Sequence, residues 1–310
     1  MEKKNCRPAY GQALVELGKK NDKVVALEAD LGKSTMSYLF GEAFPERYFQ
    51  CGIAEQNMAS MAAGLALTGK IAFIHSFAVF SSGRPYDQIR SSICIPGLNV
   101  KICGSSAGLS DYGDGKTHQS VDDIAIMRVL PHMTVLSPVD AVETQKMVAA
   151  MAEHDGPCYI RINRNEVPVL TDESEEYHIG KVTRMRDSKD VVVFATGIMV
   201  SQALAAAEAL EKEGISVRVV NISTIKPIDV EALKKCCEGV KGIVTAEEHN
   251  IYGGLGSAVC EALSDWRLPI KMLGIQDCFG RSAENYQLML ETYHLMPEDV
   301  AATVKAVLKA

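Results

Sequence analysis

The chain has 310 residues, of which 47% are hydrophobic and 23% are charged, and its formal net charge is -7. This composition is typical of a globular protein of two domains, and the acidic balance argues against a nucleic-acid-binding protein, which usually carries basic patches. No apolar run approaches the roughly 18 residues of a membrane span, and the first residues lack the apolar core of a signal peptide.

The nine cysteines are scattered along the chain and form no CxxC pair. A zinc or iron–sulfur site is therefore not expected. The count is odd and the residues stand in apolar stretches, which is typical of reduced thiols in a protein core. We therefore expect a cytoplasmic protein, because the reducing cytosol keeps such thiols free.

Short apolar runs alternate with helical segments over the first half of the chain. This alternation predicts a mainly parallel sheet that is covered by helices on both faces. The expected strands are 23–29, 48–50, 70–76, 98–103, 133–136 and 158–162, and the expected helices are 7–20, a segment ending near 43, one beginning at 55, 81–92 and 139–151.

The alternation stops at about 163 and begins again at 190, and the charged stretch between contains TDESEEY. We therefore predict an α/β domain at 1–165, a linker at 166–188 and a smaller α/β domain at 189–310. In the second domain the expected strands are 190–195, 216–220, 242–246 and 269–273, and the expected helices are 200–213, 230–236, 256–262 and a last one ending near 307.

Three motifs suggest chemistry but fit it poorly. Ser106 stands in a GxSxG pattern like that of a hydrolase elbow, but such an elbow needs a helix directly after the serine, and here a polar loop follows. Gly254–Gly256 lacks the third glycine and the acidic partner of a dinucleotide site, which favours a glycine turn that opens a helix. His75 ends an apolar strand, where a hydrogen-bonded core histidine is favoured over a ligand.

The stretch Cys51–Gly69 carries one carboxylate, Glu55, and no other charged group. We expect a helix that begins at Glu55, and so little charge predicts that most faces of this helix are buried. A carboxylate in the first turn is stabilised by the helix dipole but loses hydration on burial. Glu55 is therefore expected either to be paired or to await a partner outside this chain.

Two further features follow expected strand ends, where open α/β sheets bind ligands. Phe77 and Phe80 follow one strand, and their aromatic faces could enclose a flat heterocycle. Plain core packing is an equal alternative for either ring. Asp30 follows another strand and Ser34 stands at the next helix start, with simple helix capping by either residue as the alternative.

A long polar loop at 105–119 contains glycines together with Asp111, Asp114, Lys116 and His118. A loop of this length that keeps charges and a histidine at a strand end is often functional. A solvated surface loop is the alternative interpretation.

Together, these segments resemble one family. EADLG, GIAEQNM, SFAVF, GDGKTHQ, RINRNEVP and DCFGRSAE resemble, in order, motifs of the second half of transketolase, and the resemblance covers nearly the whole chain. It implies a parallel-sheet domain of the type that binds the pyrimidine of thiamine diphosphate, followed by the smaller transketolase C-terminal domain. The related 1-deoxyxylulose-phosphate synthases share several motifs, and the β subunits of oxo-acid dehydrogenases share the architecture.

The resemblance implies roles toward a cofactor. In transketolases the glutamate of G-I-x-E binds the aminopyrimidine of thiamine diphosphate, which implies a cofactor-binding and catalytic role for Glu55. A carboxylate on the ring nitrogen stabilises the imino tautomer, much as an aspartate orients a catalytic histidine. Phe77 and Phe80 match the aromatic pair around the pyrimidine, and Asp30 matches an acid near the cofactor. Tyr86 is a candidate for the third aromatic that the family often has.

The resemblance also implies substrate-binding residues. Asp114 and His118 match an acid and a histidine that contact the hydroxyls of the sugar, and a histidine there can act catalytically by moving protons. Arg7 and Arg164 match arginines that grip the sugar phosphate, for which the guanidinium fork is well suited. Ser34 is included among the expected substrate contacts.

One expected motif of the family is missing. Thiamine diphosphate enzymes hold the diphosphate through Mg²⁺ with a GDG motif that is followed further on by an asparagine. Gly113–Gly115 imitates the start of this motif, but no asparagine follows before Asn163. No metal ligand is therefore assigned to this chain. The resemblance implies an N-terminal partner subunit that carries the diphosphate- and Mg²⁺-binding domain, in a heterotetramer with a second copy of this chain.

The predicted function is that of the C-terminal subunit of a split transketolase, which moves a two-carbon ketol unit from a ketose phosphate to an aldose phosphate. The first alternative is another thiamine-dependent reaction, either a synthase that condenses pyruvate with an aldose phosphate or an oxo-acid dehydrogenase β subunit. The second is a non-catalytic binding half of the same fold. The joint presence of Glu55, Asp114, His118 and Arg164 argues against that second alternative.

Overall fold

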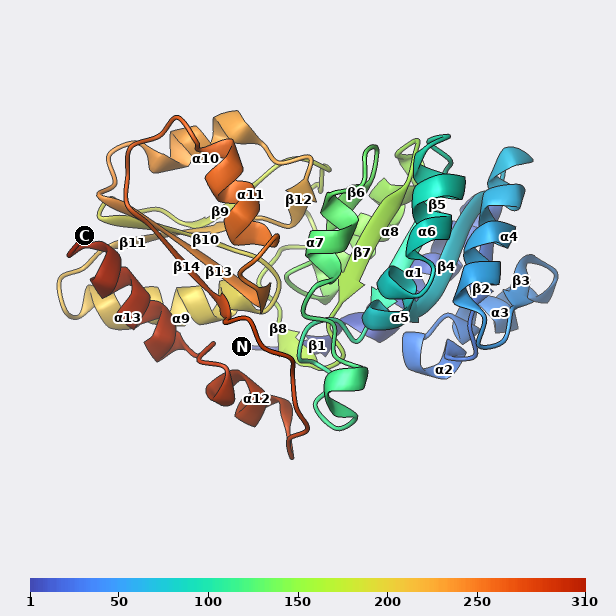
Figure 1. The fold of residues 1–310 in the computed structure, drawn as a ribbon, viewed down its shortest axis with the longest axis horizontal. Coiled ribbons are helices and arrows are strands. Elements are labelled where there is room, and N and C mark those ends of the chain that lie inside the picture. Colours follow the sequence, from blue (N-terminus) through green and yellow to red (C-terminus); the bar gives the residue numbers. More distant parts are fainter.

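The computed structural model describes residues 1–310. Two α/β units lie side by side, the first in blue to green and the second in yellow to red (Figure 1). Each unit is built on its own sheet, and helices pack against the faces of both sheets. The predicted fold class, two α/β domains in this order, is confirmed.

The first unit contains a seven-stranded sheet. All of its neighbouring strands are parallel except the edge pair β12–β6. The central strands are buried along their whole length, as expected for a parallel sheet that is covered on both faces. In spatial order the strands are β12 (Thr224–Lys226), β6 (Thr134–Leu136), β7 (Cys158–Ile162), β5 (Val100–Ser105), β4 (Ile71–Phe77), β2 (Val24–Glu28) and β3 (Tyr48–Gln50).

The direction in which the chain builds this sheet reverses between β2 and β4. From β2 the chain continues outward to β3, whereas from β4 it continues to β5 on the opposite side. Open α/β sheets bind ligands at such a switch point, in the crevice outside the carboxyl ends of the strands. The topology therefore points to the place where β2 and β4 end.

The helices of the first unit differ from the prediction in three places. The single helix expected to end near 43 is divided into two, at 32–35 and 38–43, because Met36 between them has a left-handed backbone with φ 65°. The predicted helix at 81–92 is divided, because Pro85 has no N–H with which to continue the hydrogen bonding of α5. The sequence did not predict α7. The helices are α1 (Cys6–Lys20), α2 (Gly32–Thr35), α3 (Tyr38–Ala43), α4 (Glu55–Leu67), α5 (Ala78–Gly83), α6 (Tyr86–Gln88), α7 (Asp123–Arg128) and α8 (Ala141–Glu153). A π-helical segment, η2 (Ile89–Cys94), continues α6, and η1 (Pro45–Arg47) and η3 (Gly115–Thr117) are short 3-10 turns.

The second unit contains a five-stranded sheet with parallel inner strands and one antiparallel edge strand, β9. Residues 166–188, expected to be a linker, contain β9 and also β8, which pairs with β1. Strand pairing therefore fixes this segment at two places. In spatial order the strands of this sheet are β14 (Ile270–Ile275), β13 (Gly242–Asn250), β10 (Val191–Ala195), β11 (Val217–Asn221) and β9 (Thr183–Arg186), whereas β1 (Lys3–Asn5) and β8 (Glu166–Pro168) form a separate two-stranded sheet. The helices of the second unit are α9 (Met199–Glu211), α10 (Val230–Cys237), α11 (Leu255–Ala262), α12 (Tyr286–Thr292) and α13 (Pro297–Val307).

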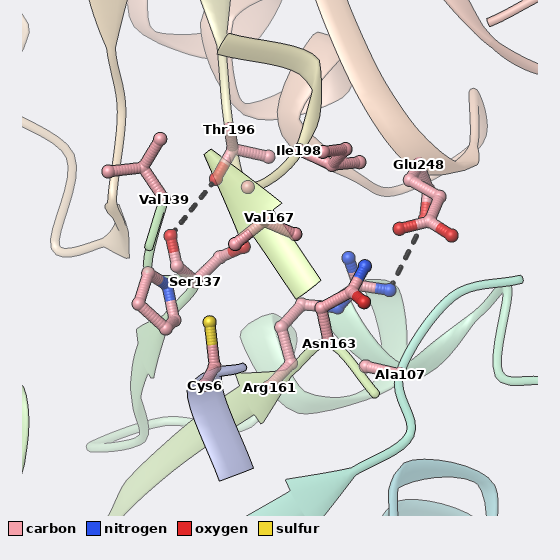
Figure 2. Close-up of a pocket in the computed structure, with 12 residues that line it drawn as sticks. Cys6, Ala107, Ser137, Val139, Arg161, Asn163, Val167, Thr196, Ile198 and Glu248 are labelled. Atoms are coloured by element: carbon pink, nitrogen blue, oxygen red, sulfur yellow. Dashed lines mark hydrogen bonds between the residues drawn. The ribbon is translucent and has the colours of Figure 1, made fainter. Parts of the chain in front are cut away.

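The two units share a strand and a core. β12, from the second half of the chain, forms the edge of the first sheet beside β6, and one cluster of 41 buried side chains includes residues of both units. Polar contacts cross the same interface. Arg161 donates from Nη2 to the main-chain oxygen of Glu248 at 3.2 Å, and the Thr196 hydroxyl donates to the main-chain oxygen of Ser137 (Figure 2). The units are therefore not independent modules.

The nine cysteines form no disulfide, and six of them are buried. Burial raises the pKa of the Cys103 thiol to about 12, so this side chain behaves as a small apolar core residue. Separately, none of the helices combines the length and the apolar character that crossing a membrane requires.

Candidate active site

The residues singled out in the sequence gather at one edge of the first sheet. Parallel strands present their carboxyl ends at the same edge, so the segments that follow five of them meet there. These residues are Asp30 and Ser34 after β2, Glu55 after β3, Phe77 and Phe80 at the end of β4 and in α5, Asp114 and His118 after β5, and Arg164 after β7, while Arg7 lies in α1.

Glu55 is the first residue of α4, and only 2% of its surface is exposed. Its carboxylate has a partner within the chain, because Arg84 donates from Nη1 to Oε1 at 2.6 Å. The Arg84 side chain is 42% exposed, so a buried negative charge is compensated by a cation that still reaches water. The sequence analysis missed Arg84, although it stands four residues after Phe80, a spacing that places two side chains on one helix face.

Only one face of α4 is buried, whereas the sequence predicted burial of most faces. Met58 and Ala62 represent the buried side of the helix. On the other side, Met61 and Leu67 are exposed, and Ile53 just before the helix is 73% exposed. The low charge of α4 therefore reflects an apolar surface that this chain does not cover. Such a surface is typical of a contact face.

Three rings form a cluster beside the Glu55–Arg84 pair. Phe77 and Phe80 are stacked at an interplanar angle of 18°, with their centroids 6.1 Å apart, and the His118 ring meets Phe80 edge-on at 5.2 Å. The Arg84 guanidinium covers the Phe80 ring, with Cζ 3.9 Å from its centroid. A flat, nitrogen-rich group therefore contacts an aromatic face and a carboxylate at the same time.

Charged side chains form the other end of this cluster. Arg164 donates to the buried Asp111 carboxylate at 2.5 Å, lies 3.6 Å from Asp114, and has Cζ 5.9 Å from the centroid of Phe77. Burial lowers the pKa of Arg7, and the positive charge of nearby Arg164 lowers it further. Two guanidinium groups that repel each other would be stabilised by an anion placed between them.

Asp30 and Ser34 lie at the margin of the cluster. The main-chain oxygen of Ser34 accepts a hydrogen bond from Arg7 Nη1 at 3.0 Å, which links the two segments. Asp30 is exposed, and its main-chain N–H donates to the Glu28 carboxylate at 3.0 Å. Both residues line a hollow at the end of β2. Neither caps α2, whose N-cap is Leu31 without a side-chain hydrogen bond, so the capping alternative was wrong.

Two details differ from the pattern of the resembling family. Tyr86, the candidate third aromatic, packs against the core cluster that includes Met58 and Ile89, and the group that lies over Phe80 is Arg84 instead. In the Gly113–Gly115 motif, the aspartate faces Arg164. No group of three or more histidine, cysteine, aspartate or glutamate side chains is placed to hold a metal ion.

The three motifs that fitted chemistry poorly have structural explanations. Ser106 is buried, no helix follows it, and its hydroxyl has no hydrogen-bond partner, which is not the arrangement of a hydrolase nucleophile. At Gly254 the turn opens α11, and the Glu247 carboxylate accepts hydrogen bonds from the first N–H groups of that helix, where a dinucleotide phosphate would bind. His75 bonds a main-chain oxygen of β2 and the Tyr10 hydroxyl, and burial lowers its pKa to about 4.

Comparison with protein-family patterns identifies both units. The transketolase pyrimidine-binding domain matches residues 2–169, and the transketolase C-terminal domain matches residues 180–300. The first match alone covers more than half of the chain.

Similar proteins match over nearly the whole chain. A protein named as a transketolase C-terminal section, from Methanocaldococcus jannaschii, is 44% identical over 99% of this chain and 97% of its own length. A 6-deoxy-6-sulfo-D-fructose transketolase subunit from a Clostridium strain is 42% identical over 90% of this chain and 87% of its own length. Among solved structures, a split-gene transketolase described as an inactive β4 tetramer is 46% identical, with a TM-score of 0.89 over 98% of both chains.

Proposed function

This chain belongs to the transketolase family, and from that premise we propose that it is the C-terminal subunit of a two-chain transketolase. With its partner it would transfer a two-carbon ketol unit from a ketose phosphate to an aldose phosphate. Two relatives named as a C-terminal section and a split-gene enzyme, each matching almost completely, support the division into two chains.

One observation carries the proposal: a continuous series of contacts runs from the buried carboxylate to the arginines. Glu55 pairs with Arg84, Arg84 covers Phe80, and Phe80 stacks on Phe77, which lies below Arg164. The His118 ring packs against both phenylalanines. A place for a flat ring and a place for an anion are therefore neighbours at one end of the sheet.

The residues at the first place fit the aminopyrimidine of thiamine diphosphate. The Arg84 guanidinium, which is planar and rich in N–H donors, already makes the two contacts that such a ring requires, with Glu55 and with Phe80. When bound, the cofactor supplies the electron sink for carbon–carbon bond cleavage. Glu55 would hold the proton at the ring nitrogen, and Phe77 and Phe80 would orient the ring.

The residues at the second place fit a sugar phosphate. Arg164 and Arg7 would bind the phosphate, while Asp114 and His118 would bind hydroxyls, His118 also moving a proton during transfer. The relative named for a sulfo-sugar supports this class of substrate, because a sulfonate is also a tetrahedral anion. We assign Ser34 to the same substrate, through its contact with Arg7.

The diphosphate and Mg²⁺ are assigned to a partner subunit. Asp30 would lie beside the cofactor at the junction of the two chains, since it is exposed in a hollow at the end of β2. The exposed apolar face of α4, next to Glu55, supports a contact with that partner. A cytoplasmic heterotetramer with two copies of each chain is the assembly that this proposal implies.

Reconstitution tests the assignment of two chains. With thiamine diphosphate and Mg²⁺, the isolated chain is expected to show no ketol transfer between xylulose and ribose phosphates. Addition of a chain that carries the diphosphate-binding domain is expected to restore it. Full turnover by this chain alone would contradict the proposal. Pyruvate consumption by the mixture without ketol transfer would instead favour the synthase or dehydrogenase alternative.

Replacement of Arg164 tests the class of substrate. In the reconstituted enzyme, Arg164→Ala is expected to raise KM for a phosphorylated ketose by about 10- to 100-fold, since a hydrogen bond to a charged group contributes roughly 1.5–3 kcal/mol. KM for an unphosphorylated ketose should stay unchanged. Arg186→Ala, which removes an arginine of β9 that pairs with Glu211, is the control. Equal effects on both ketoses would show that Arg164 does not bind the phosphate.

A further inference from the structure

The loop of the first unit that carries Asp114 and His118 is fixed by contacts with the second unit. We call residues 106–119 the substrate loop. At its start, Leu109 donates from its main-chain nitrogen to the buried Glu248 carboxylate of β13 at 2.8 Å. The main chain at Gly108 lies so close to the Glu248 carboxylate that a Cβ added at Gly108 would be 2.6 Å from Glu248 Cδ. The beginning of the loop is therefore tied to the other unit.

A second segment of that unit runs along the rest of the loop. Residues 280–283, between β14 and α12, lie beside the green loop that follows β5 (Figure 1). The main-chain N–H of Ala283 donates to the main-chain oxygen of Tyr112 at 2.8 Å. At Gly115, which has φ 74°, an added Cβ would lie 2.5 Å from Ser282 Oγ. The loop is therefore packed closely against this segment at Tyr112 and at Gly115.

Gln119 makes a further contact between the substrate loop and residues 280–283. Its side chain is buried, and Nε2 donates both to the main-chain oxygen of Asp111 at 3.0 Å and to that of Arg281 at 2.9 Å. Both amide hydrogens are therefore used, one within the loop and one across the interface. Asp111 carries the carboxylate that binds Arg164, and Gln119 directly follows His118. One side chain thus links the two ends of the proposed sugar site.

We propose that Gln119 and the main chain of residues 280–283 are positioning elements that fix the separation between Arg164 and His118, whereas the Arg281 side chain takes no part. The second unit would thereby help to set the length of sugar phosphate that the enzyme accepts. This inference rests on the proposed function, since it assigns the phosphate to Arg164 and the hydroxyls to His118.

Two variants disturb the contact between Gln119 and residues 280–283, one from each side. Gln119→Leu removes both hydrogen bonds at similar volume. Gly280→Ala places a Cβ 1.7 Å from Gln119 Oε1, and Gly280 does not have a positive φ that would oppose alanine. In the reconstituted enzyme, both variants are expected to raise KM for aldose phosphates about tenfold, as two lost hydrogen bonds imply, with kcat within about twofold. They should also reduce the preference between four- and five-carbon acceptors.

Arg281→Ala is the matched control. It keeps the main-chain oxygen that Gln119 uses and removes only an exposed side chain, which donates to Thr292. Its KM values should equal those of the unmodified enzyme. Unchanged KM and acceptor preference in a folded Gly280→Ala variant would overturn the inference, and so would an equal loss of kcat for every substrate. Failure of the unmodified reconstituted enzyme to transfer ketol units would instead contradict the proposed function.

Discussion

Glu55→Gln is expected to lower kcat of the reconstituted enzyme by on the order of 10²- to 10⁴-fold, the range typical of a lost general acid–base group. The amide keeps the size of the side chain but cannot share a proton with a ring nitrogen as a carboxylate does. Binding of thiamine diphosphate should be less affected than turnover, because the phenylalanine faces and the partner subunit remain. The measurement is kcat at saturating cofactor, together with the cofactor Kd.

The fold should tolerate this change, since the Arg84 side chain is partly exposed and can turn to water when its partner loses the charge. Glu143→Gln is the control variant. Glu143 is another buried glutamate; it accepts hydrogen bonds from Val139 and Asn221 and from none of the candidate site residues, and burial raises its pKa to about 7. Similar activity of Glu55→Gln and Glu143→Gln would exclude a catalytic role for Glu55.

Asp123→Asn is expected to lower the free energy of unfolding by roughly 3–5 kcal/mol, the cost of leaving one member of a buried ion pair without its partner. Asp123 is fully buried and accepts hydrogen bonds from Arg161 at 2.9 and 3.1 Å and from the Tyr159 hydroxyl at 2.7 Å. Burial alone would raise its pKa, but Arg161, His249 and the Tyr159 hydroxyl together outweigh that effect and keep the pKa below its ordinary value.

Glu261→Gln is the comparison, because it also converts an acid that pairs with an arginine into its amide. The Glu261 side chain is 64% exposed in its pair with Arg128, so the expected loss is below about 1 kcal/mol. Chemical denaturation of both variants at neutral pH measures the difference. Losses of similar size in the two variants would mean that burial does not strengthen the Asp123 contact.

The sequence predicted the parallel strands and the main residues of the candidate site for the same physical reason. Buried parallel strands appear as continuous apolar runs, and their carboxyl ends meet at one edge. Residues that follow those runs, such as Glu55, Phe77 and His118, could therefore be expected to lie together. The spatial order of the strands, and with it the switch point between β2 and β4, could not be obtained from periodicity.

The contacts that the sequence did not predict depend on long-range packing. β9 and β12 are short edge strands with charged residues, TRMR and TIK, which carry no apolar period of their own. Arg84 could be noticed by its spacing from Phe80, but its pairing with Glu55 joins residues that are 29 positions apart in the sequence. No local sequence pattern predicts the contact between Gln119 and Arg281, because these residues lie in different units, 162 positions apart in the sequence.

The position of β12, which comes from the second half of the chain but pairs with β6 in the first sheet, has a consequence for the order of folding. During synthesis the chain emerges from its N-terminus, and β9, β10, α9 and β11 of the second unit are all made before β12. The first sheet can therefore acquire its last strand only after the first part of the second unit, through β11, has emerged. Until then the edge of β6 lacks its neighbour and can pair with another nascent chain. The first unit therefore cannot be complete before synthesis of the second unit has begun, and the two units complete their folds in overlapping steps.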